Sequence, residues 1–194
     1  MNMPGIIINK NFWKFSVYYW AFLTIQTFMY MRNITLIIVH CSANRAGSAV
    51  RMADIDRYHR SLGWNGCGYH YVIPIDGTIE QGRPEEKVGA HCKNHNSHSI
   101  GVCYIGGLAA DGKTPQDTRT EAQKRALRVL LEDLHKRYPK ALIVGHCDLD
   151  PKKPCCPGFN VINDYRLTIN DFSTDDTEEH GWVSASGLWW RQQE

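Results

Sequence analysis

The sequence has almost no excess of charge of either sign. Its 194 residues carry 22 lysines and arginines against 20 aspartates and glutamates, a formal net charge of +2, without a run of five basic residues. Binding to a nucleic-acid backbone needs a basic patch or stripe. We therefore expect no nucleic-acid partner. The length indicates one folded domain with a core of its own.

Cysteine pairs of the Cys-x-x-Cys type and internal repeats are also missing. The seven cysteines are odd in number and irregularly spaced, unlike the framework of a small disulfide-rich protein. A structural zinc finger closes its site with four ligands, usually from such pairs. These absences exclude both classes, and Cys67 and Cys103 are expected to fill the core. A domain of this length needs no metal for stability, so a bound metal is expected to serve chemistry.

The first 32 residues differ from the rest in composition. Nine of the 21 aromatic residues lie there, and residues 15–31 form an uncharged stretch. This stretch contains four serine, threonine or glutamine residues and no small-x-small cleavage pattern. Three interpretations stay open: an uncleaved anchor or poor signal, an interfacial helix, or a leader outside the domain. We favour a leader with translation starting at Met31, and membrane contact through residues 12–31 stays an alternative.

The chain is accordingly divided into three parts. Residues 1–32 are the aromatic leader, residues 33–166 the folded domain, and residues 167–194 a flexible acidic and aromatic tail without helical or strand periodicity. We expect the protein to be a monomer.

Within the domain, apolar β-branched runs predict strands at residues 34–39, 99–105 and 141–144. A hairpin is predicted around Asp76-Gly77, the strongest short turn signal, between the runs 69–75 and 78–80. Strands and helices interleave along the chain. We therefore predict an α/β fold with a mixed central β-sheet flanked by α-helices.

Two helices are predicted from caps and apolar stripes. Ser48 is expected to cap the first helix, which Gly63 ends. Its inward stripe is Met52, Ile55, His59 and Leu62. Thr120 and Gln123 form a capping box that opens the second helix. Its inward residues are Leu127, Leu130, Leu131 and Leu134.

Polar side chains follow two of the predicted strands directly. His40 comes after the first strand and His146 after the last, and Cys155-Cys156 lies shortly beyond, between Pro154 and Pro157. Catalytic zinc takes three protein ligands, favours histidine and thiolate, and keeps a fourth position for water. The two histidines and one cysteine of the pair are therefore candidates for a zinc site.

Six separated motifs carry a resemblance to a known family. They are Val39-His40-Cys41-Ser42-Ala43, Gly68-Tyr69-His70-Tyr71, Asp76-Gly77-Thr78, Val88-Gly89-Ala90-His91, Ser99-Ile100-Gly101-Val102, and Gly145-His146 with Cys156-Pro157-Gly158-Phe159. Together they resemble the type 2 N-acetylmuramoyl-L-alanine amidases of the bacteriophage T7 lysozyme branch, a family that includes the peptidoglycan recognition proteins. The resemblance covers about residues 34–161.

The resemblance implies the fold of that family and a zinc-dependent hydrolase, endolysin-like, that cuts the amide between N-acetylmuramic acid and L-alanine in peptidoglycan. It implies His40, His146 and Cys156 as ligands of Zn²⁺, with Cys155 as a neighbour that does not bind the metal. Tyr69 would assist catalysis close to the metal. His70 should face the other way, because neighbours on a strand alternate.

The catalytic lysine of the family falls on Lys152 when counted from His146, and on Lys153 when counted back from Cys156, because this chain has two extra residues there. We choose Lys152, which keeps the Pro-Lys pair, with Lys153 as the alternative. His91 and Asn96 correspond to positions where relatives contact substrate; a surface histidine and a turn asparagine are their alternatives.

Two other functions remain to be weighed. A peptidoglycan-binding module of the same fold without catalysis is the first, and a thiol hydrolase with Cys41 or Cys147 as nucleophile is the second. The second is geometrically poor, because each cysteine is adjacent in sequence to a histidine and adjacent strand residues face opposite ways.

Overall fold

The computed structural model describes residues 32–165, and its centre is a five-stranded sheet in the order β4-β3-β5-β1-β7. The sheet strands are β1 Leu36–Cys41, β3 Tyr71–Ile73, β4 Glu80–Gln81, β5 Ser99–Tyr104 and β7 Leu142–Gly145. Strand β1 pairs in parallel with β5 and with β7, and β4 alone runs antiparallel to its neighbour. The mixed sheet of the predicted α/β fold is confirmed.

Shorter elements complete the described part. A second sheet contains only β2 Asn44–Arg45 and β6 Gly107–Leu108. Two 3-10 turns flank the main strands: η1 Asn96–His98 directly precedes β5, and η2 His146–Asp148 directly follows β7. Helix α4 Val161–Asp164 is the last helix of the described residues. Residues 1–31 of the predicted leader, with the membrane contact proposed for residues 12–31, and the whole predicted tail lie outside the described residues.

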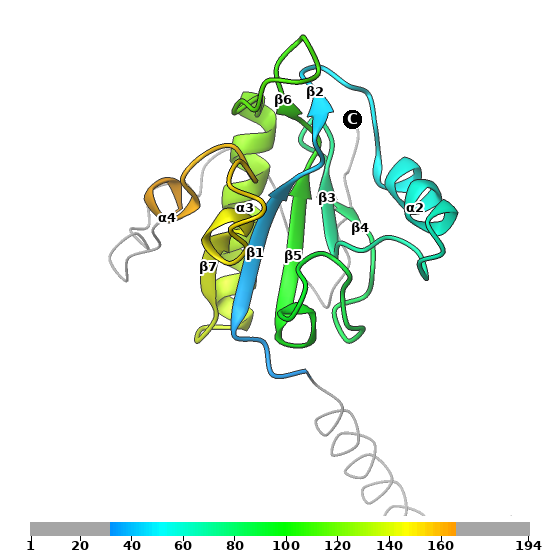
Figure 1. Cartoon of the computed structure of the whole chain (residues 1–194). Helices are drawn as coiled ribbons and strands as arrows, with labels where there is room; N and C mark the ends of the chain where they lie inside the picture. The colour runs from blue at the N-terminus through cyan, green and yellow to red at the C-terminus, as the bar shows by residue number, and fades with distance from the viewer. Residues whose placement is uncertain (1–31, 166–194) are drawn as a thin grey trace, which may run out of the picture.

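Helix α3 Glu121–Arg137 covers one face of the sheet. Figure 1 shows it behind the strands, with α2 Met52–Ser61 beyond β3 and β4. The core under α3 contains Ile37 and Val39 of β1 together with Leu127 and Leu131, all fully buried. Side chains alternate along a strand, so Ile38 and His40 point to the opposite face. The face that α3 leaves uncovered is therefore the one on which His40 lies.

The capping box of α3 is confirmed and extends into the sheet. Thr120 Oγ1 accepts a hydrogen bond from Gln123 N at 3.1 Å, and Gln123 Oε1 accepts one from Thr120 N at 3.0 Å. Gln123 Nε2 also donates to Ile73 O at 3.0 Å and to Ile105 O at 2.9 Å. One buried amide thus joins the first turn of α3 to the ends of two strands.

The predicted start of α2 was wrong. The helix begins at Met52 with Arg51 as N-cap, and not after Ser48. Met52 N donates to a carboxylate oxygen of Glu80 at 2.8 Å, so an acidic side chain from β4 satisfies the free helix N–H. Leu62 is 50% exposed just after the helix, so the inward stripe ends at His59.

The hairpin around Asp76-Gly77 is confirmed with shorter strands than predicted. Tyr71 pairs with Gln81 and Val72 with Glu80. Gly77 has φ +82°, and an added Cβ there would lie 2.7 Å from Ala122 O. The turn therefore needs glycine both for its backbone and for its close approach to α3.

Within residues 32–165, none of the helices combines the length and the hydrophobicity that crossing a membrane would require.

Replacement of Gln123 tests its link between helix and sheet. Gln123→Ala removes the partners of the Ile105 carbonyl oxygen and the Thr120 N–H, and it leaves Ile73 O with the hydrogen bond from Ile105 N alone. We expect the free energy of unfolding to fall by about 2 to 4 kcal/mol. Urea denaturation measures it. The matched control is Lys124→Ala, next in sequence and on the exposed surface, which should change stability little. Equal effects of the two substitutions would contradict the role of Gln123.

Candidate metal centre

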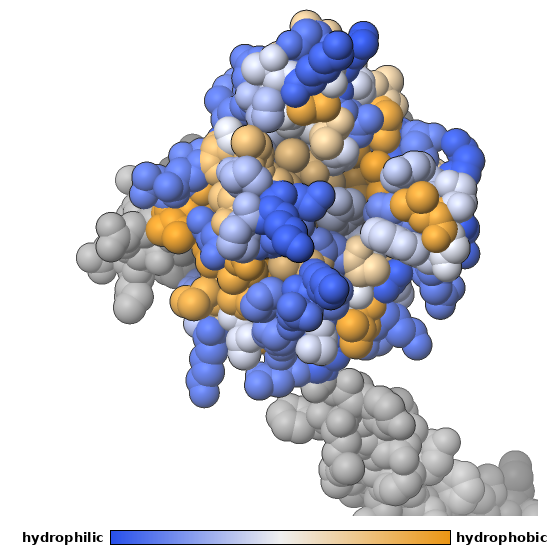
Figure 2. Space-filling view, in the orientation of Figure 1, coloured by the Kyte–Doolittle hydropathy of each residue, from blue (hydrophilic) through white to orange (hydrophobic). Residues whose placement is uncertain are grey.

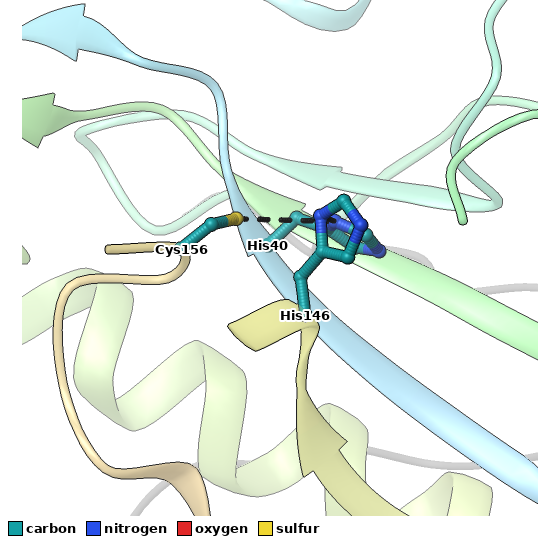
Figure 3. Close-up of side chains that lie close together, drawn as sticks. All are labelled: His40, His146 and Cys156. Atoms are coloured by element: carbon teal, nitrogen blue, oxygen red, sulfur yellow. Dashed lines mark hydrogen bonds between the residues drawn. The ribbon is translucent and has the colours of Figure 1, made fainter. Parts of the chain in front are cut away.

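Three side chains from three separate elements meet on the face of the sheet opposite α3. They are His40 at the end of β1, His146 at the start of η2, and Cys156 in the loop before α4 (Figure 3). Their nitrogen and sulfur ligand atoms all lie within 4.8 Å of one another. His40 Nδ1 lies 3.1 Å from His146 Nδ1 and 4.0 Å from Cys156 Sγ.

The parallel register of β1 and β7 explains the meeting of the two histidines. Val39 is opposite Gly145, so the residues that follow leave the same edge of the sheet side by side. Polar groups and ligands commonly collect at the carboxyl ends of parallel strands. Here that edge presents one imidazole from each strand.

Backbone hydrogen bonds hold the cysteine loop against this edge. Cys147 N donates to Cys156 O at 2.8 Å, and Tyr104 Oη donates to Pro157 O at 2.7 Å. Cys41 N donates to the sulfur of Cys156 at 3.4 Å. Cys155, its sequence neighbour, is exposed and is not part of the group. The structure thus brings together the three predicted ligands and leaves Cys155 outside.

Burial keeps both histidines neutral. His40 and His146 are 1% and 8% exposed. Burial lowers the pKa of His40 well below its ordinary value, with the neighbouring histidines adding to the effect, and burial also lowers the pKa of His146. Neutral imidazoles offer lone pairs, which a metal ion requires.

The thiols of Cys41 and Cys156 interact with each other. This interaction, together with burial, raises the pKa of Cys156, and it lowers the pKa of Cys41 to about 7 although burial acts in the opposite direction there. A cation between the imidazoles would favour the anion on Cys156 instead, because a coordinating thiol loses its proton. Two neutral imidazole nitrogens 3.1 Å apart beside a thiol form a nitrogen and sulfur donor set that fits a metal ion.

Each histidine has a further partner on its Nε2 side. His40 Nε2 lies 3.1 Å from His91 Nδ1, and His146 Nε2 lies 3.9 Å from a carboxylate oxygen of Asp150. Such outer partners orient metal-binding histidines. Asp150 was missed in the sequence, although its position four residues after His146 in a turn was a signal for it.

Tyr69 lies beside this group, with its ring centroid 5.3 Å from that of His40. Burial raises the pKa of Tyr69 well above its ordinary value, so the phenol keeps its proton and is a hydrogen-bond donor at neutral pH. His70 takes a different direction, since its Nδ1 accepts a hydrogen bond from Gly101 N at 2.9 Å.

Both candidate lysines are exposed, and they differ in their relation to His146. Lys152 N donates to a side-chain oxygen of Asp150 at 2.9 Å. The positive charge of Lys153 contributes to the lowered pKa of His146, after the larger effect of burial. The charge of Lys153 therefore lies within electrostatic reach of the site.

Asn96 acts within its own loop. Its Oδ1 accepts hydrogen bonds from His91 N at 2.8 Å and Cys92 N at 2.9 Å. The side chain thus fixes the backbone that carries His91. Its Nδ2 makes no hydrogen bond within residues 32–165.

The cysteines of the rival thiol mechanism have no histidine partner in the described part of the chain. The Cys41 thiol interacts with Cys156, and the Cys147 sulfur donates to Asp148 Oδ1 at 3.8 Å. Cys67 and Cys103 are 4% and 0% exposed, as predicted for core residues. Figure 2 shows the side of the molecule opposite α3, on which hydrophilic and hydrophobic residues are intermixed.

The adjacent cysteines offer a matched test of the donor set. We expect Co²⁺ to give a thiolate-to-metal absorption band in the unaltered protein. Cys156→Ser should abolish this band, whereas Cys155→Ser should keep it, because only Cys156 faces the two histidines. Titration with Co²⁺, followed by absorbance, measures both. Loss of the band in Cys155→Ser alone would reverse the assignment.

Comparison with known proteins agrees with this geometry. The family model "N-acetylmuramoyl-L-alanine amidase" (Amidase_2) matches residues 30–159. The endolysin of Klebsiella phage KP32 is 44% identical over 125 residues, which are 64% of this chain and 81% of the relative. The endolysin of Escherichia phage T7 is 42% identical over the same shares of both chains.

A solved structure gives the same result for the fold. The endolysin and N-acetylmuramoyl-L-alanine amidase LysCS from Clostridium intestinale is similar with a TM-score of 0.59 and 28% identity, over 72% of this chain and 88% of that one. The predicted fold class is confirmed. With its central sheet, its His-His-Cys group and a matching segment of this extent, the chain belongs to the N-acetylmuramoyl-L-alanine amidase family, Amidase_2.

Proposed function

We propose that the protein is a zinc-dependent N-acetylmuramoyl-L-alanine amidase that hydrolyses the amide between the lactyl group of N-acetylmuramic acid and L-alanine in peptidoglycan. The observation that carries this proposal is the convergence of His40, His146 and Cys156 in a chain of this family. The endolysins of two phages, similar over most of their length, support peptidoglycan as the partner.

Zinc is the metal that this donor set fits best. Two imidazoles and one thiolate are ligands typical of a catalytic zinc site, in which a fourth position stays open. A bound Zn²⁺ supplies Lewis-acid chemistry, because it lowers the pKa of water to about 7 and polarises a carbonyl. The thiolate of Cys156 reduces the net charge of the site, and the buried histidines stay neutral.

Residues of the chain then complete the reaction. Tyr69, protonated and beside His40, is placed to donate a hydrogen bond to the attacking water or to the substrate carbonyl. The ammonium group of Lys152, with Lys153 as the alternative, stabilises the negative charge that develops on the carbonyl oxygen. His91 and the free amide nitrogen of Asn96 border the position of the substrate.

The protein is proposed to act as a monomer, because all three metal ligands come from one chain. Contact with a membrane through residues 12–31 stays a prediction, as do the leader 1–32 and the tail 167–194. A binding module without catalysis is the second candidate function, and retention of Cys156 argues against it, since loss of this ligand would remove the site.

Mass spectrometry of digested peptidoglycan tests the proposed function. We expect stem peptides with a new free amino group on L-alanine, together with glycan that has lost its peptide. His146→Ala and treatment with a zinc chelator should abolish this release, and added Zn²⁺ should restore it after chelation. Binding of muropeptides without release would favour the binding module. Release that survives chelation but not thiol alkylation would favour the thiol hydrolase.

The kinetics of two variants distinguish the roles of Lys152 and Lys153. Lys152→Ala should lower kcat by about 100-fold or more, the usual effect of losing one group that stabilises an oxyanion, while zinc affinity stays unchanged. Lys153→Ala is the matched comparison and should keep most of the activity. Steady-state hydrolysis of a soluble muropeptide measures both, and the reverse order would assign the role to Lys153.

A further inference from the structure

His91 lies between the metal ligand His40 and the hydroxyl of Ser99. His91 Nδ1 is 3.1 Å from His40 Nε2, and His91 Nε2 is 3.3 Å from Ser99 Oγ. Ser99 is fully buried at the start of β5. The three side chains therefore form one continuous series that ends at the metal centre.

The hydrogen bond that Ser99 makes at the far end of this series determines which atoms donate in the other two. Ser99 Oγ lies 2.7 Å from His95 O, and a carbonyl oxygen can only accept, so the hydroxyl proton is used there. Ser99 Oγ then offers a lone pair to His91, whose Nε2 must carry the hydrogen. A neutral imidazole has one N–H, so His91 Nδ1 is an acceptor.

The protonation of His40 follows from that of His91. An acceptor at His91 Nδ1 requires the hydrogen of His40 on Nε2. The lone pair of His40 is left on Nδ1, the atom that faces His146 and Cys156. The donor and acceptor order that starts at Ser99 thus places the hydrogen of His40 on Nε2 and its lone pair on Nδ1, as a metal ligand at this position needs.

The ring of His91 is held in a narrow slot made by two glycines. A Cβ added to Gly89 or to Gly101 would lie 2.5 Å from His91 Cδ2. The backbone of His91 itself is fixed by the hydrogen bond from His91 N to Asn96 Oδ1. Only the absence of side chains at both glycines leaves room for the imidazole, so its orientation is determined by packing as well as by hydrogen bonds.

We propose that His91 is a positioning residue for the metal site, and that the series Ser99, His91 and His40 fixes the tautomer and the ring orientation of His40 before the metal binds. This inference rests on the proposed zinc site and assigns His91 a role in addition to its proposed position beside the substrate. His146 has a different arrangement, with a carboxylate of Asp150 at 3.9 Å on its Nε2 side.

Zinc affinity without substrate tests the proposal, by competition with a chromophoric chelator. His91→Leu removes the acceptor, and we expect zinc affinity to fall by about 10-fold to 100-fold, as is usual when an outer partner of a metal ligand is lost. The matched control is His91→Asn. Asparagine has nearly the same shape as leucine, but its Oδ1 can replace the imidazole Nδ1 as the acceptor. Affinity in this variant should return to within a few-fold of the original protein.

Ser99→Ala removes the hydroxyl that determines the direction of the hydrogen bonds in the series. Ser99 itself contacts neither the metal ligands nor the proposed substrate position. It should weaken zinc binding several-fold. Nitrogen-15 NMR of the metal-free protein should show the hydrogen on Nε2 in both His40 and His91.

The outcomes separate this inference from the proposed function. Failure of the unaltered protein to bind zinc would overturn the proposed zinc site itself. Zinc binding that is normal in His91→Leu, with a change only in the KM for muropeptide, would overturn the positioning role and leave substrate contact. A hydrogen on Nδ1 of His91 would overturn the proposed polarity.

Discussion

The parallel pairing of β1 with β7 is the constraint on which the site depends. It aligns Val39 with Gly145, and the two histidines that follow bring their Nδ1 atoms to 3.1 Å. Strand β1 is buried on both faces and bonded on both edges, so a shift of one residue would turn Ile37 and Val39 out of the core. The hydrophobic core under α3 thus fixes the geometry of polar groups on the opposite face.

The site also illustrates how a fold can hold polar groups away from water. Burial of His40 would be costly without partners, but each of its ring nitrogens faces another polar atom. Low accessibility keeps the imidazoles neutral and therefore able to bind a cation. A metal ion bound at this site would in turn stabilise the folded chain, because the unfolded chain lacks this arrangement of donors.

A second constraint acts on the loop that carries His91. The guanidinium of Arg32, which sequence reasoning had grouped with the leader, donates hydrogen bonds to five backbone carbonyl oxygens and lies 3.0 Å from His70 Nε2. The carbonyl groups belong to Glu85, Lys87, Asn96, Ser97 and Ser99. A single side chain at the edge of the domain therefore connects both ends of this loop to the sheet.

The fold class, the capping box of α3 and the family could be predicted from the sequence, because β-branched runs, local caps and separated motifs are properties of residue type and order. The sequence also placed His40 and His146 at strand ends. It could not place the start of α2, because Glu80, which satisfies the Met52 N–H, comes from a distant strand. Only the tertiary structure separated Cys156 from Cys155 by geometry, revealed Asp150, and brought His91 between His40 and Ser99. These relations join residues that are distant in sequence or identical in type, and hydrogen-bond direction depends on their arrangement in space.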